Sequence, residues 1–467
     1  MTQLRRVRGR RGIALIFTAI ALVFIIPMVG LVIDAGVLYT VKAKLQMAVD
    51  AGSLAAGRAL SRGLDGAAQQ ASARSTARAY VLMNFPTGYF NIASPVVPDN
   101  AIVIDESVTN QRSVTVTAGV TVPLYFMRWL GANTTGVNAT ATAVRRDVNV
   151  IIVMDRSGSL ANSGSCAPLK AAAVNFVGKF SNGRDNVGLV TFASSSMNDF
   201  PAATNFGTAS PTVPAILNSI TCTGATNSAQ GLYQGYGQLV ALAQPNALNV
   251  ILFFTDGYPT AMTALFPIQG GSSCSSKTAK TAVLSFGGTS PWGLMNQVAA
   301  AQPMSSDLTI GPPGNTAGCS YASSWTSSAT SVTSDIQSIP QADIYGNAMN
   351  TNYQPVTYTD GTHTNMTVNW LTIQNASVNA ADSMGLRIRT GATIPAGAGI
   401  PNVHVYCIGL GNSGGVPDDF LERVSNDARA SNYDSTKPTG FYIFSPTAAD
   451  LTDAFDRIAS EILHLSK

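Results

Sequence analysis

The longest apolar stretch of the chain lies near its N-terminus. Residues 13–33 carry no charged side chain. At 1.5 Å per residue, a helix of this length spans about 30 Å, the thickness of the hydrocarbon core of a bilayer. Residues 1–12 contain five arginines, and the positive-inside rule places such a tail in the cytoplasm. The pattern predicts a basic cytoplasmic tail and an uncleaved transmembrane helix. The alternative, a cleaved secretory signal, has a shorter apolar core and a small-x-small cleavage site.

The period of the apolar positions then changes twice. Residues 34–84 are rich in alanine and contain no proline, which favours helix. Their apolar stripe is rough, so we expect a helical stalk that is solvated or, with weak heptads, a coiled coil. Over residues 85–146, valine, isoleucine and alanine alternate with threonine and serine. This period of two predicts half-buried antiparallel strands, and hence a small β-rich spacer.

From residue 147 to residue 467, short apolar runs alternate with helical stripes. The strand-like runs cover residues 187–192, 249–254 and 402–408. Their apolar residues occupy successive positions, as in parallel strands that are buried on both faces. Helical stripes over residues 229–242 and 451–462 lie between or after these runs. The alternation predicts an α/β fold with a doubly wound, mostly parallel sheet.

The stretch at about residues 260–370 does not fit this alternation. It lacks clear periodicity and is rich in glycine, serine, threonine and asparagine. We interpret it as a long insertion in the domain. Loops of this length are usually functional or disordered. The insertion therefore either shapes a binding site beside the sheet or is a flexible surface segment.

An apolar run at residues 148–154 ends in a carboxylate. Asp155 follows it directly, and Ser157 and Ser159 come next, with a glycine between the two serines. These side chains offer only oxygen atoms, which suits a hard cation such as Mg²⁺. The alternative is an N-cap turn that starts a helix and has no ligand.

Two later segments favour the cation site. The apolar run 249–254 is followed by Thr255 and then by Asp256 and a glycine, and a polar loop that contains Thr226 precedes it. The carboxyl ends of parallel strands share one edge of a sheet, where ligands bind. We therefore expect Asp155 and Asp256 to meet at that edge.

Together, these three segments resemble the von Willebrand factor A domain. That family has a metal-ion-dependent adhesion site built from Asp-x-Ser-x-Ser, a distant Thr and a distant Asp-Gly, in this order. The matching residues of this chain are Asp155, Ser157, Ser159, Thr226 and Asp256. The resemblance implies a bound divalent cation, Mg²⁺ first and Mn²⁺ or Ca²⁺ as alternatives. It also implies a protein partner whose acidic group completes the coordination.

The N-terminal segment carries a second resemblance. Arg-Gly-x-Ala-Leu-x-Phe at residues 11–17 precedes Pro27 and Gly30, and the strings Val-Ile-Asp-Ala-Gly and Leu-Gln-x-Ala-Val-Asp-Ala follow at residues 32–36 and 45–51. This pattern resembles the TadG-like proteins of Tad (Flp) pilus assembly. The resemblance implies a part in the assembly, anchoring or surface display of a Tad-type pilus. Together with the cytoplasmic tail predicted above, it leads us to expect a single-pass protein of the bacterial inner membrane, with the metal-binding domain in the periplasm or at the surface.

The five cysteines fit an extracytoplasmic domain. Cys166 follows the first metal loop and Cys222 precedes the loop of Thr226, while Cys274 and Cys319 both lie in the insertion. Disulfides form in oxidising compartments. Pairing within each couple is the most economical connectivity, and it leaves Cys407 as a buried strand residue. No Cys-x-x-Cys is present, so zinc and redox motifs are not supported.

Charge and composition exclude other classes of function. Only 11% of the residues are charged and the net charge is +3, which is too small to indicate nucleic-acid binding. The three histidines lack metal-ligand spacing, and no nucleophile elbow or phosphate-binding loop occurs. We expect no enzyme but a metal-dependent adhesion or protein-binding component of pilus assembly or surface attachment. The alternatives are an adhesin or ligand-binding module unrelated to pili, a hydrolase or chelatase subunit, and a scaffold with a vestigial site.

Overall fold

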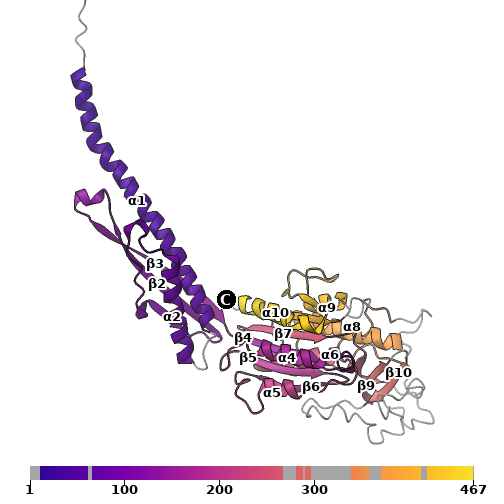
Figure 1. Ribbon diagram of the computed structural model, residues 1–467. Coiled ribbons are helices and arrows are strands. Elements are labelled where there is room, and N and C mark those ends of the chain that lie inside the picture. Colours follow the sequence, from indigo (N-terminus) through magenta and orange to yellow (C-terminus); the bar gives the residue numbers. More distant parts are fainter. Residues whose placement is uncertain are drawn as a thin grey trace, which may run out of the picture. The chain divides into compact units, whose positions relative to one another are not determined.

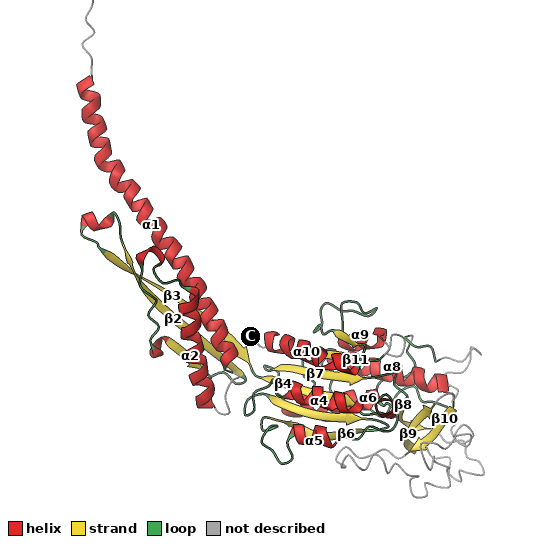
Figure 2. Cartoon of the chain, in the orientation of Figure 1, coloured by secondary structure: helices red, strands yellow, loops and turns green. Residues whose placement is uncertain are grey.

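The chain forms two compact units. The computed structural model describes residues 11–60, 66–266, 280–287, 290–295, 338–351, 353–356, 370–411 and 418–465. The units are Met1–Arg145 and Arg146–Ser466, so the boundary lies at the end of the predicted spacer. Figures 1 and 2 show their helices and strands. The first ten residues of the basic tail, Cys274 and Cys319 lie outside the described residues.

Helix α1 extends without a break from Arg11 to Ala59. The predicted membrane span and part of the predicted stalk are therefore one element. Large apolar side chains of α1 between Ile16 and Ile33 are exposed, and the mean hydropathy of its most apolar window is 2.8. Within the described part of the chain, α1 alone has the length and composition to cross a membrane. This finding fits the predicted single-pass anchor.

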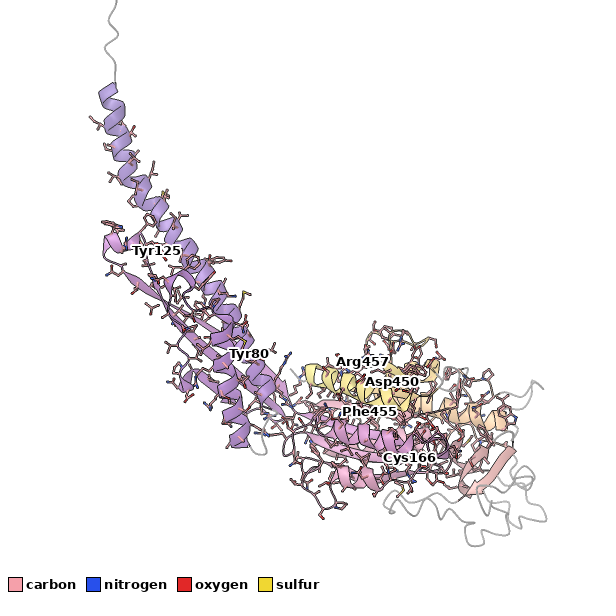
Figure 3. The ribbon with its side chains drawn as sticks, viewed as in Figure 1. Tyr80, Tyr125, Cys166, Asp450, Phe455 and Arg457 are labelled. Carbon is pink, nitrogen blue, oxygen red and sulfur yellow. A yellow bond between two sulfur atoms is a disulfide. The ribbon has the colours of Figure 1, made fainter. Side chains whose placement is uncertain are left out.

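A second helix and a three-stranded sheet complete the first unit. The elements are α2 (Gly66–Asn84), the 3₁₀ helices η1 (Tyr89–Asn91), η2 (Asp99–Ala101) and η3 (Met127–Leu130), and strands β1 (Ile102–Asp105), β2 (Gln111–Pro123) and β3 (Thr134–Arg146). The strands lie in the order β1-β2-β3, and β1 is antiparallel to β2. Buried and less buried residues alternate along β2, as its period of two predicts. Figure 3 marks Tyr125, which precedes η3.

The predicted stalk and spacer share one hydrophobic core. Val41 and Leu45 of α1, Val81 of α2, and Val114 and Val116 of β2 are fully buried in the same cluster. The described parts of residues 34–84 therefore do not form a solvated stalk. This packing is hard to predict from the sequence because the buried faces of α1 and α2 consist largely of alanine, whose small methyl group gives only a weak apolar stripe.

The second unit is built on a six-stranded sheet. Its strands are β4 (Val148–Asp155), β5 (Asn186–Phe192), β6 (Ser196–Ala203), β7 (Leu248–Thr255), β11 (Val403–Leu410) and β12 (Tyr442–Ser445). Their order is β12-β11-β7-β4-β5-β6. All neighbours are parallel except β6, which is an antiparallel edge strand beside β5. The sheet is thus mostly parallel, as expected.

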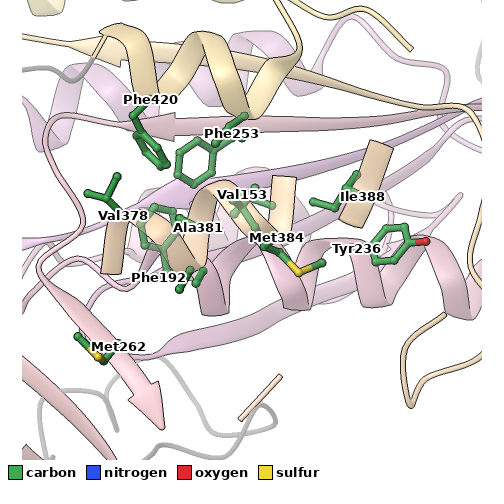
Figure 4. Close-up of a cluster of buried hydrophobic side chains, with 14 of the residues drawn as sticks. Val153, Phe192, Tyr236, Phe253, Met262, Val378, Ala381, Met384, Ile388 and Phe420 are labelled. Carbon is green, nitrogen blue, oxygen red and sulfur yellow. The ribbon is translucent and has the colours of Figure 1, made fainter. Parts of the chain in front are cut away.

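Helices cover both faces of this sheet. They are α3 (Gly158–Asn162), α4 (Cys166–Val177), α5 (Val213–Ser219), α6 (Ser228–Leu242), α8 (Trp370–Arg389), α9 (Asp418–Ser425), η5 (Ala448–Asp450) and α10 (Leu451–Leu465). Ile152 of β4 packs in one cluster with Phe455 of α10, whereas Val153 packs on the opposite face with Met384 of α8. Figure 4 shows the second cluster. Alternate residues of one strand thus enter two cores, which confirms the doubly wound α/β fold.

The described part of the insertion contains a second, antiparallel sheet. Strands β8 (Ala261–Phe266), β9 (Lys280–Gly287) and β10 (Ser290–Met295) lie in the order β10-β9-β8. Met262 and Leu284 lie opposite each other on β8 and β9, and both enter the core beside α8. The expected lack of regular structure is therefore wrong for these residues. Cross-strand pairing and burial stabilise strands whose local pattern is weak.

The burial of this small sheet predicts different effects on stability for two of its leucines. Leu284 is fully buried, whereas Leu265 is 53% exposed. Leu284→Ala should lower the free energy of unfolding by about 2–5 kcal/mol because it leaves a cavity in the core. Leu265→Ala, the control, should change it by less than about 1 kcal/mol. Urea titration of both variants measures the difference, and equal effects would mean that β9 is not part of the core.

Candidate metal centre

Two aspartates lie at the carboxyl ends of neighbouring strands. Asp155 is the last residue of β4, and Asp256 directly follows β7. The strands are parallel and paired in register, with Met154 opposite Phe254. The sheet therefore brings both carboxylates to one edge.

Asp155 is fully buried and its carboxylate accepts two hydrogen bonds. The backbone N–H of Ser157 donates to Oδ1 at 2.7 Å, and the Thr255 hydroxyl donates to Oδ2 at 2.7 Å. The first bond turns the chain back toward the strand end, and Ser157 then occupies the N-cap position of α3 without a capping bond from its side chain. The sequence did not assign a role to Thr255, although a polar residue at the end of an apolar strand was a usable signal.

Both serines converge on Asp256. The hydroxyl of Ser159 donates to Asp256 Oδ1 at 2.7 Å and lies 2.9 Å from the hydroxyl of Ser157. Ser157 Oγ is 3.5 Å from the same carboxylate oxygen. Hydrogen bonds thus link four of the five predicted residues directly, across two chain segments about a hundred residues apart.

The fifth residue, Thr226, lies in a loop that is bonded to both other segments through its backbone. Its N–H donates to the Thr260 hydroxyl at 2.9 Å, and its carbonyl accepts from the N–H of Thr260 at 2.9 Å. Gly158 N–H donates to the carbonyl of Gly224 at 2.9 Å, and Gly224 has a φ of 97°, which favours glycine. In the described residues, the Thr226 side chain forms no hydrogen bond to the other four.

The segments that form this site match a known protein family. The family model described as "von Willebrand factor type A domain" matches residues 150–259, which contain all five residues. The chain carries a von Willebrand factor A domain. A second family model, described as "Putative Flp pilus-assembly TadE/G-like", matches residues 12–59. The N-terminal region is therefore TadE/G-like, as its motif indicates.

Solved structures similar to this chain are distant in sequence. They include the PilB minor pilin from Streptococcus sanguinis, with 15% identity, a TM-score of 0.37 and coverage of 81% of this chain and 80% of that chain. The vWF domain of the type V pili tip protein Mfa5 from Porphyromonas gingivalis has 14% identity, a TM-score of 0.38 and coverage of 70% and 98%. A von Willebrand factor type A protein from Catenulispora acidiphila has 11% identity, a TM-score of 0.34 and coverage of 75%, but only 46% of its own length is matched. No match to the chain is found among curated proteins.

In the von Willebrand factor A domain, called the A domain from here on, two acidic groups lie close together in a poorly solvated site. Burial, and then the negative charge of Asp256, raise the pKa of Asp155 to about 7, against the opposing effect of the hydrogen bonds from Thr255 and Ser157. Burial also raises the pKa of Asp256, although the hydroxyl of Ser159 opposes the shift. No basic side chain among the described residues forms an ion pair with either carboxylate. The pair therefore favours the arrival of a positive charge, a proton or a cation.

A disulfide fixes the A-domain loops near this site. Cys166, at the start of α4, is bonded to Cys222, which is the pairing expected from the sequence. The next residue, Thr223, donates its N–H to the carbonyl of Arg156 at 2.7 Å. The segment that leads to Thr226 is thus bonded covalently to the start of α4 and, through its backbone, to the loop that follows Asp155.

The donor atoms fit a hard divalent cation. Ser157, Ser159 and Asp256 already bring their oxygen atoms within 3.5 Å of one another, and oxygen is the ligand that Mg²⁺ and Ca²⁺ prefer. The described residues contain no group of three or more His, Cys, Asp or Glu that could bind a metal. A softer ion such as Zn²⁺ therefore has no nitrogen or sulfur ligand set here.

Proposed function

We propose that this chain is a membrane-anchored, protein-binding component of a Tad (Flp) pilus system, and that its A domain captures a partner in a metal-dependent way. The observation that supports this best is the convergence of Ser157, Ser159 and Asp256 beside Asp155. The TadE/G-like region at residues 12–59 supports the pilus context. The proposal assigns binding to this site and no catalysis.

In this proposal some of the site residues bind the cation and others position those ligands. Ser157, Ser159 and Thr226 would offer hydroxyl oxygens to Mg²⁺, or to Mn²⁺ or Ca²⁺. Asp256 would supply negative charge, and Asp155 orients Ser157 through its N–H while adding a second charge. A bound cation supplies a Lewis-acidic position for an acidic group of the protein partner.

The localisation in this proposal follows from the arginines that precede the apolar part of α1. The arginines before the apolar run favour a cytoplasmic N-terminus. With α1 as a single span, the A domain would then lie beyond the bacterial inner membrane, in the periplasm or at the surface. The Cys166–Cys222 disulfide supports an oxidising compartment.

Metal-dependent co-purification of the full chain tests the function. The chain is solubilised from membranes with Mg²⁺, and bound proteins are eluted with EDTA and identified by mass spectrometry. Pilus-assembly or pilus-surface proteins should elute from wild type and be lost with Ser159→Ala, which removes the oxygen that faces Asp256. Ser163→Ala is the control because Ser163 bonds to Leu160 and Ser165 instead.

Two outcomes would contradict different parts of the proposal. Capture that survives EDTA would remove the role of the metal. Elution by EDTA of proteins unrelated to pili would keep metal-dependent adhesion but remove the pilus assignment.

A further inference from the structure

The connection between β2 and β3 carries exposed apolar side chains beside the membrane-spanning part of α1. Trp129 is 80% exposed and Leu130 is 72% exposed. Both belong to η3, the short 3₁₀ helix of the first unit. Large apolar groups that face water are costly, so such a pair on one turn requires an explanation.

This turn packs against α1 itself. A hollow of about 260 Å³ lies between Ile26 and Leu31 of the helix and Phe126, Trp129 and Leu130 of the connection. The approach is close at Gly30, where an added Cβ would lie 2.7 Å from the Cβ of Phe126. The ring of Phe126 therefore occupies the space that a larger residue of α1 would need.

Asp34 fixes the connection at this height of the helix. Its carboxylate is buried and accepts hydrogen bonds from three successive backbone N–H groups: Tyr125 at 2.8 Å, Phe126 at 3.0 Å and Met127 at 2.8 Å. A charged acceptor that is bonded to three donors makes a strong, directional link. The connection is thus fastened one residue beyond the predicted end of the span.

We propose that residues 125–131 insert into the outer leaflet of the membrane and form a second contact with lipid beside α1. Ile26 lies seven residues before Ile33, about 10 Å along the helix. η3 therefore lies at the depth of the last turns of the span, the interfacial layer in which amphipathic elements lie and tryptophan is enriched.

Three observations favour lipid as the partner of this surface. The hollow shares Ile26 and Leu31 with the apolar span, so whatever surrounds the span also reaches Trp129. Val32 and Ile33 are 67% and 43% exposed at the same height, so the described residues of the first unit leave this band of the helix open. The guanidinium of Arg128 lies 5.9 Å from the Trp129 ring centroid, and its long side chain can extend to the phosphate headgroups.

Depth-dependent quenching of Trp129 tests the proposal, which depends on α1 spanning the membrane. The full chain with Trp292→Phe, Trp325→Phe and Trp370→Phe is reconstituted in phosphatidylcholine–phosphatidylglycerol vesicles. Trp129 emission should shift to shorter wavelength, lose most of its intensity with lipids brominated near the headgroup, and resist aqueous acrylamide. Extraction of the vesicles with alkaline carbonate checks separately that the chain remains membrane-bound.

Two glycine variants provide a matched comparison on the same helix. Gly30→Ala should displace Phe126 and reduce the quenching of Trp129 by brominated lipid, whereas Gly36→Ala meets nothing within 4 Å and should not. Quenching by acrylamide alone would place the turn in water. Protection from both quenchers would indicate cover by protein, such as a second copy of the chain. Either result, in a chain that resists carbonate, would overturn the lipid contact and leave the anchor intact.

Discussion

Replacing Asp155 with asparagine is expected to abolish the stabilisation of the A domain by Mg²⁺ without unfolding it. Asparagine retains an oxygen that can accept the N–H of Ser157. Its amide can donate to Thr255, whose hydroxyl lies 3.1 Å from the carbonyl of Gly257 and can donate there instead. The fold should therefore persist. With Asp256 as the only carboxylate of the five residues, too little anionic oxygen remains to offset dehydration of the ion.

Thermal melts in EDTA and in excess Mg²⁺ measure this effect. At a free Mg²⁺ concentration of about 100 Kd, wild type should gain about 2.7 kcal/mol, and Asp155→Asn almost nothing. In EDTA the variant should melt at the wild-type temperature or above it, since two close carboxylates no longer repel each other.

Asp185→Asn is the control for that experiment. Asp185 is another buried aspartate, but it accepts from Val148 and Ser181 at the opposite end of the sheet. This variant should lose stability and keep its full response to Mg²⁺. If Asp155→Asn responds to Mg²⁺ like wild type, the metal site is wrong. If Asp155→Asn unfolds in EDTA under conditions where wild type stays folded, Asp155 is a structural cap.

The second large effect is expected from the double replacement of Cys166 and Cys222 by serine. The two cysteines are separated by 56 positions, and closing a loop of that size in the unfolded chain corresponds to about 4 kcal/mol. Domains are typically stable by only about 5–15 kcal/mol, so the variant should be marginal at 37 °C. Its affinity for Mg²⁺ should also fall, because the segment before Thr226 is then bonded to the first loop only through backbone hydrogen bonds.

Denaturant titration and calorimetric Mg²⁺ titration separate these two consequences. Wild type in reductant should reproduce the double variant, which controls for the serine side chains. Unchanged Mg²⁺ affinity in a destabilised variant would mean that the disulfide stabilises the domain but does not position the site. The first unit has its own core and should melt as before.

The meeting of Asp155 and Asp256 could be predicted because it depends on topology alone. Two apolar runs that end in aspartate, in a parallel sheet, place both carboxylates at one edge whatever the intervening chain does. The Cys166–Cys222 pair could be predicted for the same reason, since each cysteine flanks a loop that must reach that edge. For Thr255 the polar residue at the strand end was a signal of some role, but the hydrogen bond to Asp155 could not be predicted, because it depends on the orientation of one hydroxyl.

The packing that could not be predicted from the sequence involves contacts between residues far apart in the chain. The helices of residues 34–84 lie on a sheet formed by later residues, and small alanine side chains give little sign of it. The strands of the insertion depend on partners such as Met262 and Leu284, twenty-two positions apart. A sequence pattern describes each apolar run by itself, whereas cross-strand pairing and burial determine whether the run forms a strand.

The unbroken course of α1 has a mechanical consequence. From Val41 to Ala56 one face of the helix is buried along about 22 Å of its length, and the same helix continues into the apolar span. A tension applied along the helix axis would load these contacts side by side, in shear, so that many must slide together before any is lost. Contacts loaded one after another, as in peeling, would fail at lower force. A protein that anchors a filament or holds a surface would thus pass tension from the membrane into the first unit through one continuous helix.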